Sequence, residues 1–129
     1  VRTSNPGAAE LEDLETADDR SWHEAVADRV RQWGQATTVP GQGSSIGAVV
    51  GATVPERIYR LRELMPDQPF LLPGVGAQGG DPAALGPAFG GRAHGALVSA
   101  SRSVIYADDP AAAAHDLRAV VWNAWEANG

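Results

Sequence analysis

Two segments of this sequence combine residue types that suit the binding of an anion. Residues 73–80 read Pro-Gly-Val-Gly-Ala-Gln-Gly-Gly, and residues 101–103 read Ser-Arg-Ser. Glycine lets the backbone approach an anionic oxygen closely, and the Gln78 amide adds a donor. The Arg102 guanidinium is a planar fork suited to bidentate contact with a phosphate. Together these segments predict a phosphate-binding site.

The glycines of the first segment also match a dinucleotide-binding fingerprint, because Gly74, Gly76 and Gly79 have the Gly-x-Gly-x-x-Gly spacing. That fingerprint expects an acidic residue about 20 residues further on, at the end of the next strand. Here residues 98–100 are Val-Ser-Ala, and Arg102 follows them. A Rossmann-type dinucleotide site is therefore disfavoured.

Each candidate segment follows a short apolar run that we expect to be a β-strand. These runs are residues 46–51, 70–72 and 96–100, and the first is of the kind that is buried on both faces. The strand centres are about 22 to 27 residues apart, which is the length of a β-loop-α-loop unit with a right-handed crossover. The sheet should therefore be parallel.

Helical patterns lie between these runs. Trp22, Val26, Val30 and Trp33 recur at helical spacing and predict an amphipathic helix that ends near Gly34, with both tryptophans in packing positions. Ahead of it, residues 8–20 contain six acidic side chains, which is typical of a solvated loop or short helix.

Three further helices are expected after the strands. Thr53 and Glu56 have capping-box spacing, with Pro55 in the first turn. The buried face of this first helix should be made by Ile58, Leu61 and Met65. The second helix is weak: it starts at Asp81-Pro82 and is interrupted by Gly86 and Pro87. The last helix is strong, is capped by Asp109-Pro110 and carries Leu117, Val121 and Trp125 on one stripe.

With the opening fragment, which reads as the end of a strand running into an Asn-Pro-Gly turn, the chain has about four βα units. That is half of an eight-unit (β/α)8 barrel, and an open four-stranded doubly wound sheet is the alternative. Either architecture brings the strand ends to one rim, at residues 3–5, 51–53, 73–80 and 101–103. We expect residues 1–129 to be a single segment of a larger barrel domain whose upstream half is missing, since the sequence does not begin with methionine.

Composition excludes several classes of function. The formal charge is −6 and no basic cluster occurs, so neither nucleic acid nor an anionic membrane is an expected partner, and no apolar run is long enough to span a bilayer. Cysteine is absent, and His23, His94 and His115 lack metal-site spacing, so each is expected to be a surface or packing residue. All ten basic residues are arginine, so no lysine-dependent step can run on this chain alone.

The ordered set of strand-end motifs resembles the orotidine 5'-phosphate decarboxylase family. The strings at residues 72–81 and 101–107 are similar to its last two strand-end motifs, and those at 49–56 and 2–7 to the two before them. The resemblance covers nearly the whole chain and is weakest in residues 8–45. Residues 2–7 look like the longer bacterial branch, and the implied fold is the carboxy-terminal half of a TIM barrel.

The resemblance also implies roles for individual residues. Ser4 would donate or accept a hydrogen bond at the pyrimidine edge, and the loop from Pro73 through Gln78 and Gly79 would cover the substrate. Gln78 would contact the phosphate, and Arg102 would hold it through side chain and backbone beside the Ser101 backbone. Many relatives have glycine where this chain has Ser101, a difference that is tolerable if only the backbone N–H is used. Without the resemblance, Ser4 would be interpreted as a turn-forming serine.

The implied activity is decarboxylation of orotidine 5'-monophosphate to UMP, without metal or organic cofactor, in a cytoplasmic homodimer. The lysines and aspartates of that reaction belong to earlier strands and to a second subunit, so no catalytic residue maps here and the isolated chain is expected to be inactive. The alternatives are a non-catalytic module that binds a phosphate ligand, and another phosphate-binding barrel enzyme such as a hexulose-phosphate synthase relative.

Overall fold

The computed structural model describes residues 1–3, 5, 7–76 and 78–128. Within them, β1 (Ala48–Val49), β2 (Phe70–Leu72) and β3 (Ala96–Val98) form a parallel sheet in the order β1-β2-β3. Arg2 makes a further parallel bridge to Val50, which places the opening segment beside β1 at the end of the sheet. The parallel α/β arrangement predicted from strand spacing is therefore confirmed.

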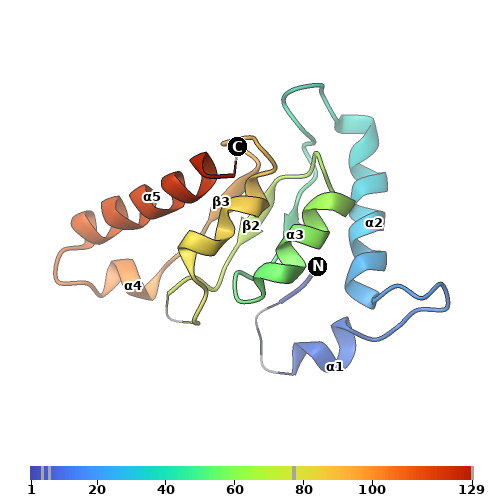
Figure 1. The fold of residues 1–129 in the computed structure, drawn as a ribbon, viewed down its shortest axis with the longest axis horizontal. Helices are drawn as coiled ribbons and strands as arrows, with labels where there is room; N and C mark the ends of the chain where they lie inside the picture. The colour runs from blue at the N-terminus through green and yellow to red at the C-terminus, as the bar shows by residue number, and fades with distance from the viewer. Residues whose placement is uncertain (4, 6, 77, 129) are drawn as a thin grey trace.

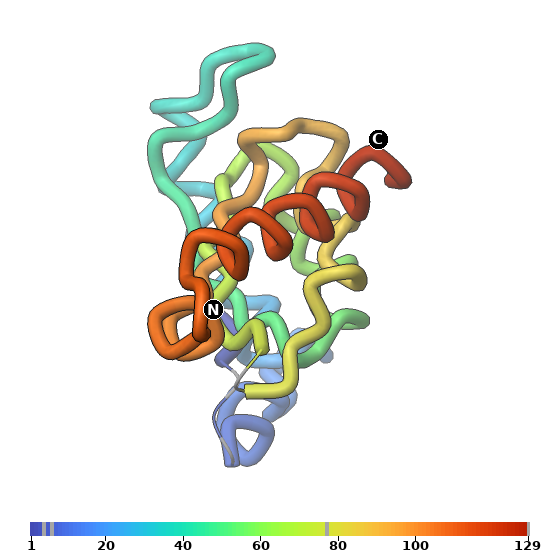
Figure 2. Tube along the Cα trace, turned by 90° about the vertical axis from the view of Figure 1, so that its left-hand side faces the viewer, coloured from blue at the N-terminus to red at the C-terminus, as the bar shows by residue number. Residues whose placement is uncertain are grey.

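The helical segments form a layer against this sheet. Helix α2 contacts α3, α3 contacts the 3-10 helix η2, and η2 contacts α5. Figure 1 shows α3 between α2 and α5, and Figure 2 shows the same layer from the α5 side. The helical segments are α1 (Ala8–Glu12), α2 (Trp22–Gly34), η1 (Gln35–Thr37), α3 (Pro55–Leu64), η2 (Pro82–Phe89), α4 (Arg102–Ile105) and α5 (Pro110–Glu126).

Only one face of the sheet is covered. The residues that point toward the helices, such as Val50, Phe70 and Leu72, are fully buried. The alternate residues Val49, Leu71 and Leu97 are 50%, 42% and 65% exposed. The expectation that the run at residues 46–51 is buried on both faces is therefore wrong at Val49. A doubly wound sheet carries helices on both faces, whereas one-sided cover is what an open part of a barrel has.

The uncovered apolar face of the sheet predicts that the isolated chain associates with itself, because unpaired strand edges and exposed apolar surface favour pairing with another copy. We expect dimers or larger aggregates in analytical ultracentrifugation, and a shift toward monomer in Leu97→Thr. The control is Val39→Thr, since Val39 is also exposed but lies outside the three strands. A monodisperse monomer with a cooperative melt would contradict this expectation.

Helix ends agree with the sequence at two sites and differ at a third. Asp109 accepts a hydrogen bond from the Ala112 N–H at 3.0 Å, and Asp81 accepts one from the Ala83 N–H at 2.9 Å, as capping residues do. The capping box expected at Thr53 is wrong, because α3 begins at Pro55 with Val54 at its N-cap. A capping box occurs instead at Ser21 of α2, whose backbone N–H donates to the Glu24 carboxylate at 3.1 Å.

The buried faces of the helices follow the predicted periodicity with one shift. Ile58, Leu61 and Met65 are fully buried, as expected. On α2 the buried residues are His23, Ala27, Val30 and Gly34, so Trp22 and Trp33 are largely exposed and their predicted packing role is wrong. At the end of this buried stripe, a Cβ at Gly34 would lie 2.6 Å from the Ser44 hydroxyl, so the helix approaches that segment too closely for a side chain at this position.

The weak helix after Asp81 runs through Gly86 and Pro87 rather than stopping there. It is a 3-10 helix, and a Cβ at Gly86 would overlap the Ala124 carbonyl oxygen of α5. Glycine at this position therefore lets α5 pack directly on η2. None of the helices in the described part of the chain is long and apolar enough to cross a membrane.

A buried arginine ties the amino-terminal ends of β2 and β3 to the helices. Arg62 of α3 is 8% exposed, and its guanidinium lies 3.8 Å from the centre of the Phe70 ring. Burial, reinforced by the nearby Arg92 charge, lowers the pKa of Arg62 to about 10, so the group is still protonated at neutral pH. Its N–H groups donate to the backbone carbonyls of Met65, Pro66, Gln68, Ala88 and Gly95 at 2.6–3.4 Å.

Candidate functional site

Backbone hydrogen bonds join the carboxyl ends of the neighbouring strands. The Gly51 N–H donates to the Arg2 carbonyl at 2.6 Å, and the Ala52 N–H donates to the Pro73 carbonyl at 2.8 Å. Beyond β2 and β3, the Ser99 N–H donates to the Leu72 carbonyl at 3.1 Å. The four strand ends therefore emerge side by side at one rim, as parallel pairing requires.

The glycine-rich loop after β2 is a compact turn. The Gly80 N–H donates to the Gly74 carbonyl at 3.0 Å, and the Gly79 N–H donates to the Gly76 carbonyl at 2.8 Å. Gly76 has a φ of +73°, and a Cβ there would lie 3.0 Å from the Ser103 hydroxyl. The positive φ therefore favours glycine at this position, and a Cβ there would also crowd the next strand-end loop.

A small polar pocket lies between these two loops. Its volume is about 160 Å³, and its lining contains one basic side chain and no acidic one. A complete small-molecule site usually measures about 300 Å³ or more, so this pocket suits one charged group of a ligand, such as a phosphate. The lining residues are Pro73, Gly74, Val75, Gln78, Ser99, Ala100, Ser101 and Arg102.

Arg102 is available to an anion at this pocket. Its side chain is exposed and makes no ion pair with a described residue, whereas Arg2, Arg60 and Arg92 are each paired to an acid. Within the described part of the chain, the backbone N–H groups of residues 101–103 also have no hydrogen-bond acceptor. The site therefore offers a guanidinium fork and several backbone donors to one ligand group.

The structure brings together most of the residues that the sequence singled out. This polar pocket is lined by Pro73, Gln78, Ser101 and Arg102, among others. Gly79 lies in the glycine-rich turn after β2 but does not line the pocket. Ser4 lies outside the described residues. A larger cavity of about 430 Å³ between β3 and α5 is mainly apolar, with Trp122 and Trp125 in its lining, so it does not suit a phosphate.

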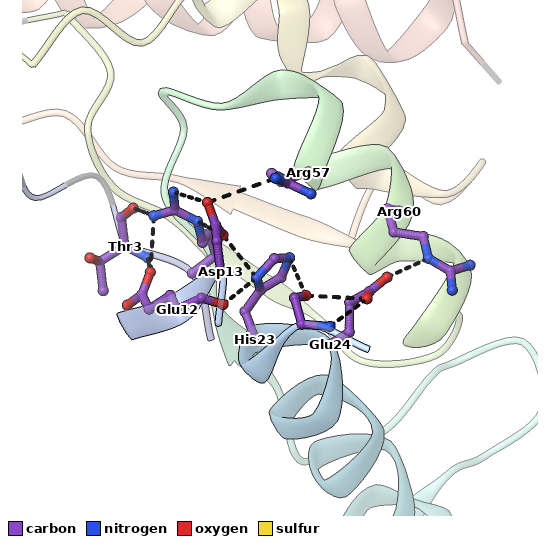
Figure 3. A network of polar contacts seen from close by, with 9 residues as sticks. Thr3, Glu12, Asp13, His23, Glu24, Arg57 and Arg60 are labelled. Atoms are coloured by element: carbon purple, nitrogen blue, oxygen red, sulfur yellow. Dashed lines mark hydrogen bonds and ion pairs between the residues drawn. The ribbon is translucent and has the colours of Figure 1, made fainter. Parts of the chain in front are cut away.

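Sequence reasoning missed a polar network at the opening strand end (Figure 3). Arg2 forms ion pairs with Glu12 at 3.0 Å and with Asp13 at 3.3 Å. The fully buried His23 places its Nδ1 3.2 Å from the Asp13 carboxylate and 2.7 Å from the Glu12 carbonyl. Residues 8–20 do include the expected short helix, but Glu12 and Asp13 are not simply solvated. An arginine within a strand was the one local signal of a buried acidic partner.

His23 is the packing residue that the sequence allowed, and its ring orientation is set by this network. Its Nδ1 lies 2.7 Å from the Glu12 carbonyl oxygen, which can only accept, so Nδ1 is the donor in this contact. The described residues contain no group of three or more His, Cys, Asp or Glu side chains that could hold a metal ion.

The chain is similar to curated proteins and to solved structures that carry related names. The chain is 46% identical over 116 residues to an orotidine 5'-phosphate decarboxylase of Haloarcula marismortui. The aligned region covers 89% of this chain and 39% of the relative. It is 42% identical over 107 residues to the enzyme of the same name from Caldicellulosiruptor bescii, covering 83% of this chain and 35% of the relative. The chain thus spans less than half the length of these curated relatives.

Among solved structures, Leishmania donovani UMP synthase matches with a TM-score of 0.75 and 38% identity, covering 96% of this chain and 26% of that one. Leishmania donovani OMP decarboxylase matches with a TM-score of 0.73 and 34% identity, covering 94% of this chain and 46% of that one. The fold is therefore part of a TIM barrel, as predicted. The sequence model of one family matches residues 1–117, and the chain belongs to that family, orotidine 5'-phosphate decarboxylase / HUMPS.

Proposed function

We propose that this chain is the phosphate- and pyrimidine-binding half of an orotidine 5'-phosphate decarboxylase, which converts orotidine 5'-monophosphate to UMP and carbon dioxide in pyrimidine biosynthesis. The observation that carries the proposal is the polar pocket shared by Gln78 and Arg102, which offers donors and one positive charge without an opposing acid. Family membership and the names of the relatives support the same reaction.

Each predicted site residue has a place in this proposal. Arg102 holds the phosphate through its guanidinium and backbone, beside the Ser101 backbone. Gln78 contacts the phosphate from the opposite loop, and that loop, with Pro73 and Gly79, covers the substrate. Ser4 is hydrogen-bonded to the pyrimidine edge. The complete enzyme is proposed to be a cytoplasmic homodimer in which residues 1–129 form one segment of the barrel domain.

In this arrangement the chain contributes binding energy rather than the chemical groups of the reaction. The phosphate is remote from the carboxylate that leaves, and interactions with such remote groups hold the substrate in the reacting geometry. Closure of a loop over the phosphate excludes water and completes the site. Loss of phosphate contacts should therefore lower kcat as well as affinity.

The test compares the chain alone with a complete enzyme. In the complete enzyme, this sequence replaces the matching segment of the Haloarcula marismortui relative, which is 46% identical to it. We expect the complete enzyme to consume orotidine 5'-monophosphate, followed by absorbance, and the chain alone to show no turnover because it contains no lysine. Turnover by the pure chain, or none by the complete enzyme, would contradict the proposed function.

A further inference from the structure

Ser99 brings a hydroxyl group to the polar pocket that the predicted site residues did not include. It directly follows β3, and its N–H donates to the Leu72 carbonyl at 3.1 Å, so the backbone still runs along β2 at this point. The side chain is half-buried and lines the pocket together with Gln78 and Arg102. Within the described part of the chain, the Ser99 hydroxyl has no hydrogen-bond partner.

The side chain of Ser99 lies on the face of the sheet that no helix covers. Successive side chains of a strand point to opposite faces. Leu97 is exposed on the uncovered face, and Val98 packs against the core on the other side. Ser99 follows two residues after Leu97 and therefore returns to the uncovered face.

The strand register identifies the neighbours of Ser99 on this face. The paired strands carry an apolar row there, made by Val49, Leu71 and Leu97. Two residues closer to the rim, the next row consists of Gly51, Pro73 and Ser99. Of these three residues, only Ser99 has a polar side chain. Its two neighbours in the row therefore offer its hydroxyl no side-chain partner.

A hydroxyl at this place needs a partner once the barrel is complete. In a complete barrel the helices lie outside, and the other face of the sheet lines the interior. A hydroxyl that loses contact with water and gains no hydrogen bond costs free energy. The pocket is the open space that Ser99 lines, so a ligand group bound there can supply the missing partner.

The other lining residues indicate which ligand group this is. Arg102 brings a positive charge and no acidic side chain lines the pocket, so an anionic oxygen is favoured there. A phosphate offers several acceptor oxygens, and a serine hydroxyl can donate to one of them. We propose that Ser99 is a further substrate-binding residue that donates a hydrogen bond to the substrate phosphate. This inference rests on the proposed function, in which Arg102 and Gln78 hold that phosphate.

The test compares ligands with and without a phosphate in the complete enzyme. UMP and ribose 5-phosphate both carry the phosphate, whereas uridine lacks it. We expect Ser99→Ala to raise the Kd for UMP and for ribose 5-phosphate by the same factor of about ten, the effect of losing one hydrogen bond to a charged group. The Kd for uridine should change less than about twofold, because no partner of the hydroxyl is then present.

Two further variants control for shape and for the substitution itself. Ser99→Cys keeps nearly the shape of serine but has only a weak S–H donor, so it should show the same phosphate-dependent loss, and it also serves if Ser99→Ala does not fold. Ser45→Ala is the matched control, because Ser45 is an exposed serine that precedes β1, at the opposite end of the sheet. It should bind all three ligands normally.

Two results would overturn the inference. Equal weakening of uridine and UMP would mean that Ser99 supports the fold or contacts the nucleoside, and normal binding by both Ser99 variants would mean that the hydroxyl does not bond the phosphate. Failure of the proposed function looks different: the unmodified enzyme would bind ribose 5-phosphate without converting orotidine 5'-monophosphate. An unmodified enzyme that binds none of the three ligands would contradict both.

Discussion

Replacing Arg102 with alanine in the complete enzyme is expected to lower kcat/KM for orotidine 5'-monophosphate by about two to three orders of magnitude. The physical reason is that truncating one partner of a charge-assisted, hydrogen-bonded pair costs about 2–5 kcal/mol. Gln78→Ala removes a neutral amide from the same pocket and should cost about two- to tenfold, since a neutral hydrogen bond contributes about 0.5–1.5 kcal/mol. The order of the two effects follows from charge.

The decisive measurement repeats the comparison on orotidine, which lacks the phosphate. If Arg102 contacts the phosphate, its replacement should have little effect on kcat/KM for orotidine, because no partner remains to be lost. Arg29→Ala is the control, as Arg29 is an exposed arginine of α2 whose guanidinium bonds only to Gln32 among the described residues. Equal fold losses on both substrates would mean that Arg102 acts through the fold.

Replacing Arg62 with methionine is expected to destabilise the folded protein by about 3–5 kcal/mol, because several buried carbonyls lose a hydrogen bond to a charged group, at about 1.5–3 kcal/mol each. Methionine fills part of the volume over Phe70 but donates no hydrogen bond. The carbonyls of Gln68 and Ala88, just before β2 and at the end of η2, would then lose their Arg62 donors. The Gly95 carbonyl, just before β3, would keep only the Phe70 N–H. The loss should appear in the free energy of unfolding measured by urea denaturation of the complete enzyme.

Arg60 provides the matched control for this measurement. It lies two residues earlier on α3, is half exposed and pairs with Glu24 and Glu63. Surface pairs of this kind contribute about 0–1 kcal/mol, so Arg60→Met should be nearly silent. Arg62→Lys should recover only part of the stability, because an ammonium cannot replace a planar fork that bonds several carbonyls at once. Similar losses for Arg60→Met and Arg62→Met would contradict the role given to Arg62.

Features that depend on neighbours in the chain could be predicted from the sequence. Local periodicity predicted the span of α2 and the buried face of Ile58, Leu61 and Met65. Capping chemistry predicted the caps at Asp81 and Asp109, and segment length predicted that the strands are parallel. The convergence of the loops that contain Gln78 and Arg102 also follows, since neighbouring parallel strands end at the same rim. Their binding roles stay predictions.

The sequence by itself thus determined the order of the elements, the rim at which a ligand could bind and the family, because each depends on residues close together or on an ordered set of motifs. Only the tertiary structure decided which side of each element is buried. Trp22 and Trp33 are exposed because α2 packs with the neighbouring stripe of His23, Ala27, Val30 and Gly34 against the rest of the chain. Glu12 and Asp13 became partners of Arg2 and His23 because the folded chain brings a strand end, a short helix and α2 together, and charges so separated in sequence carry no local pattern that names their partners.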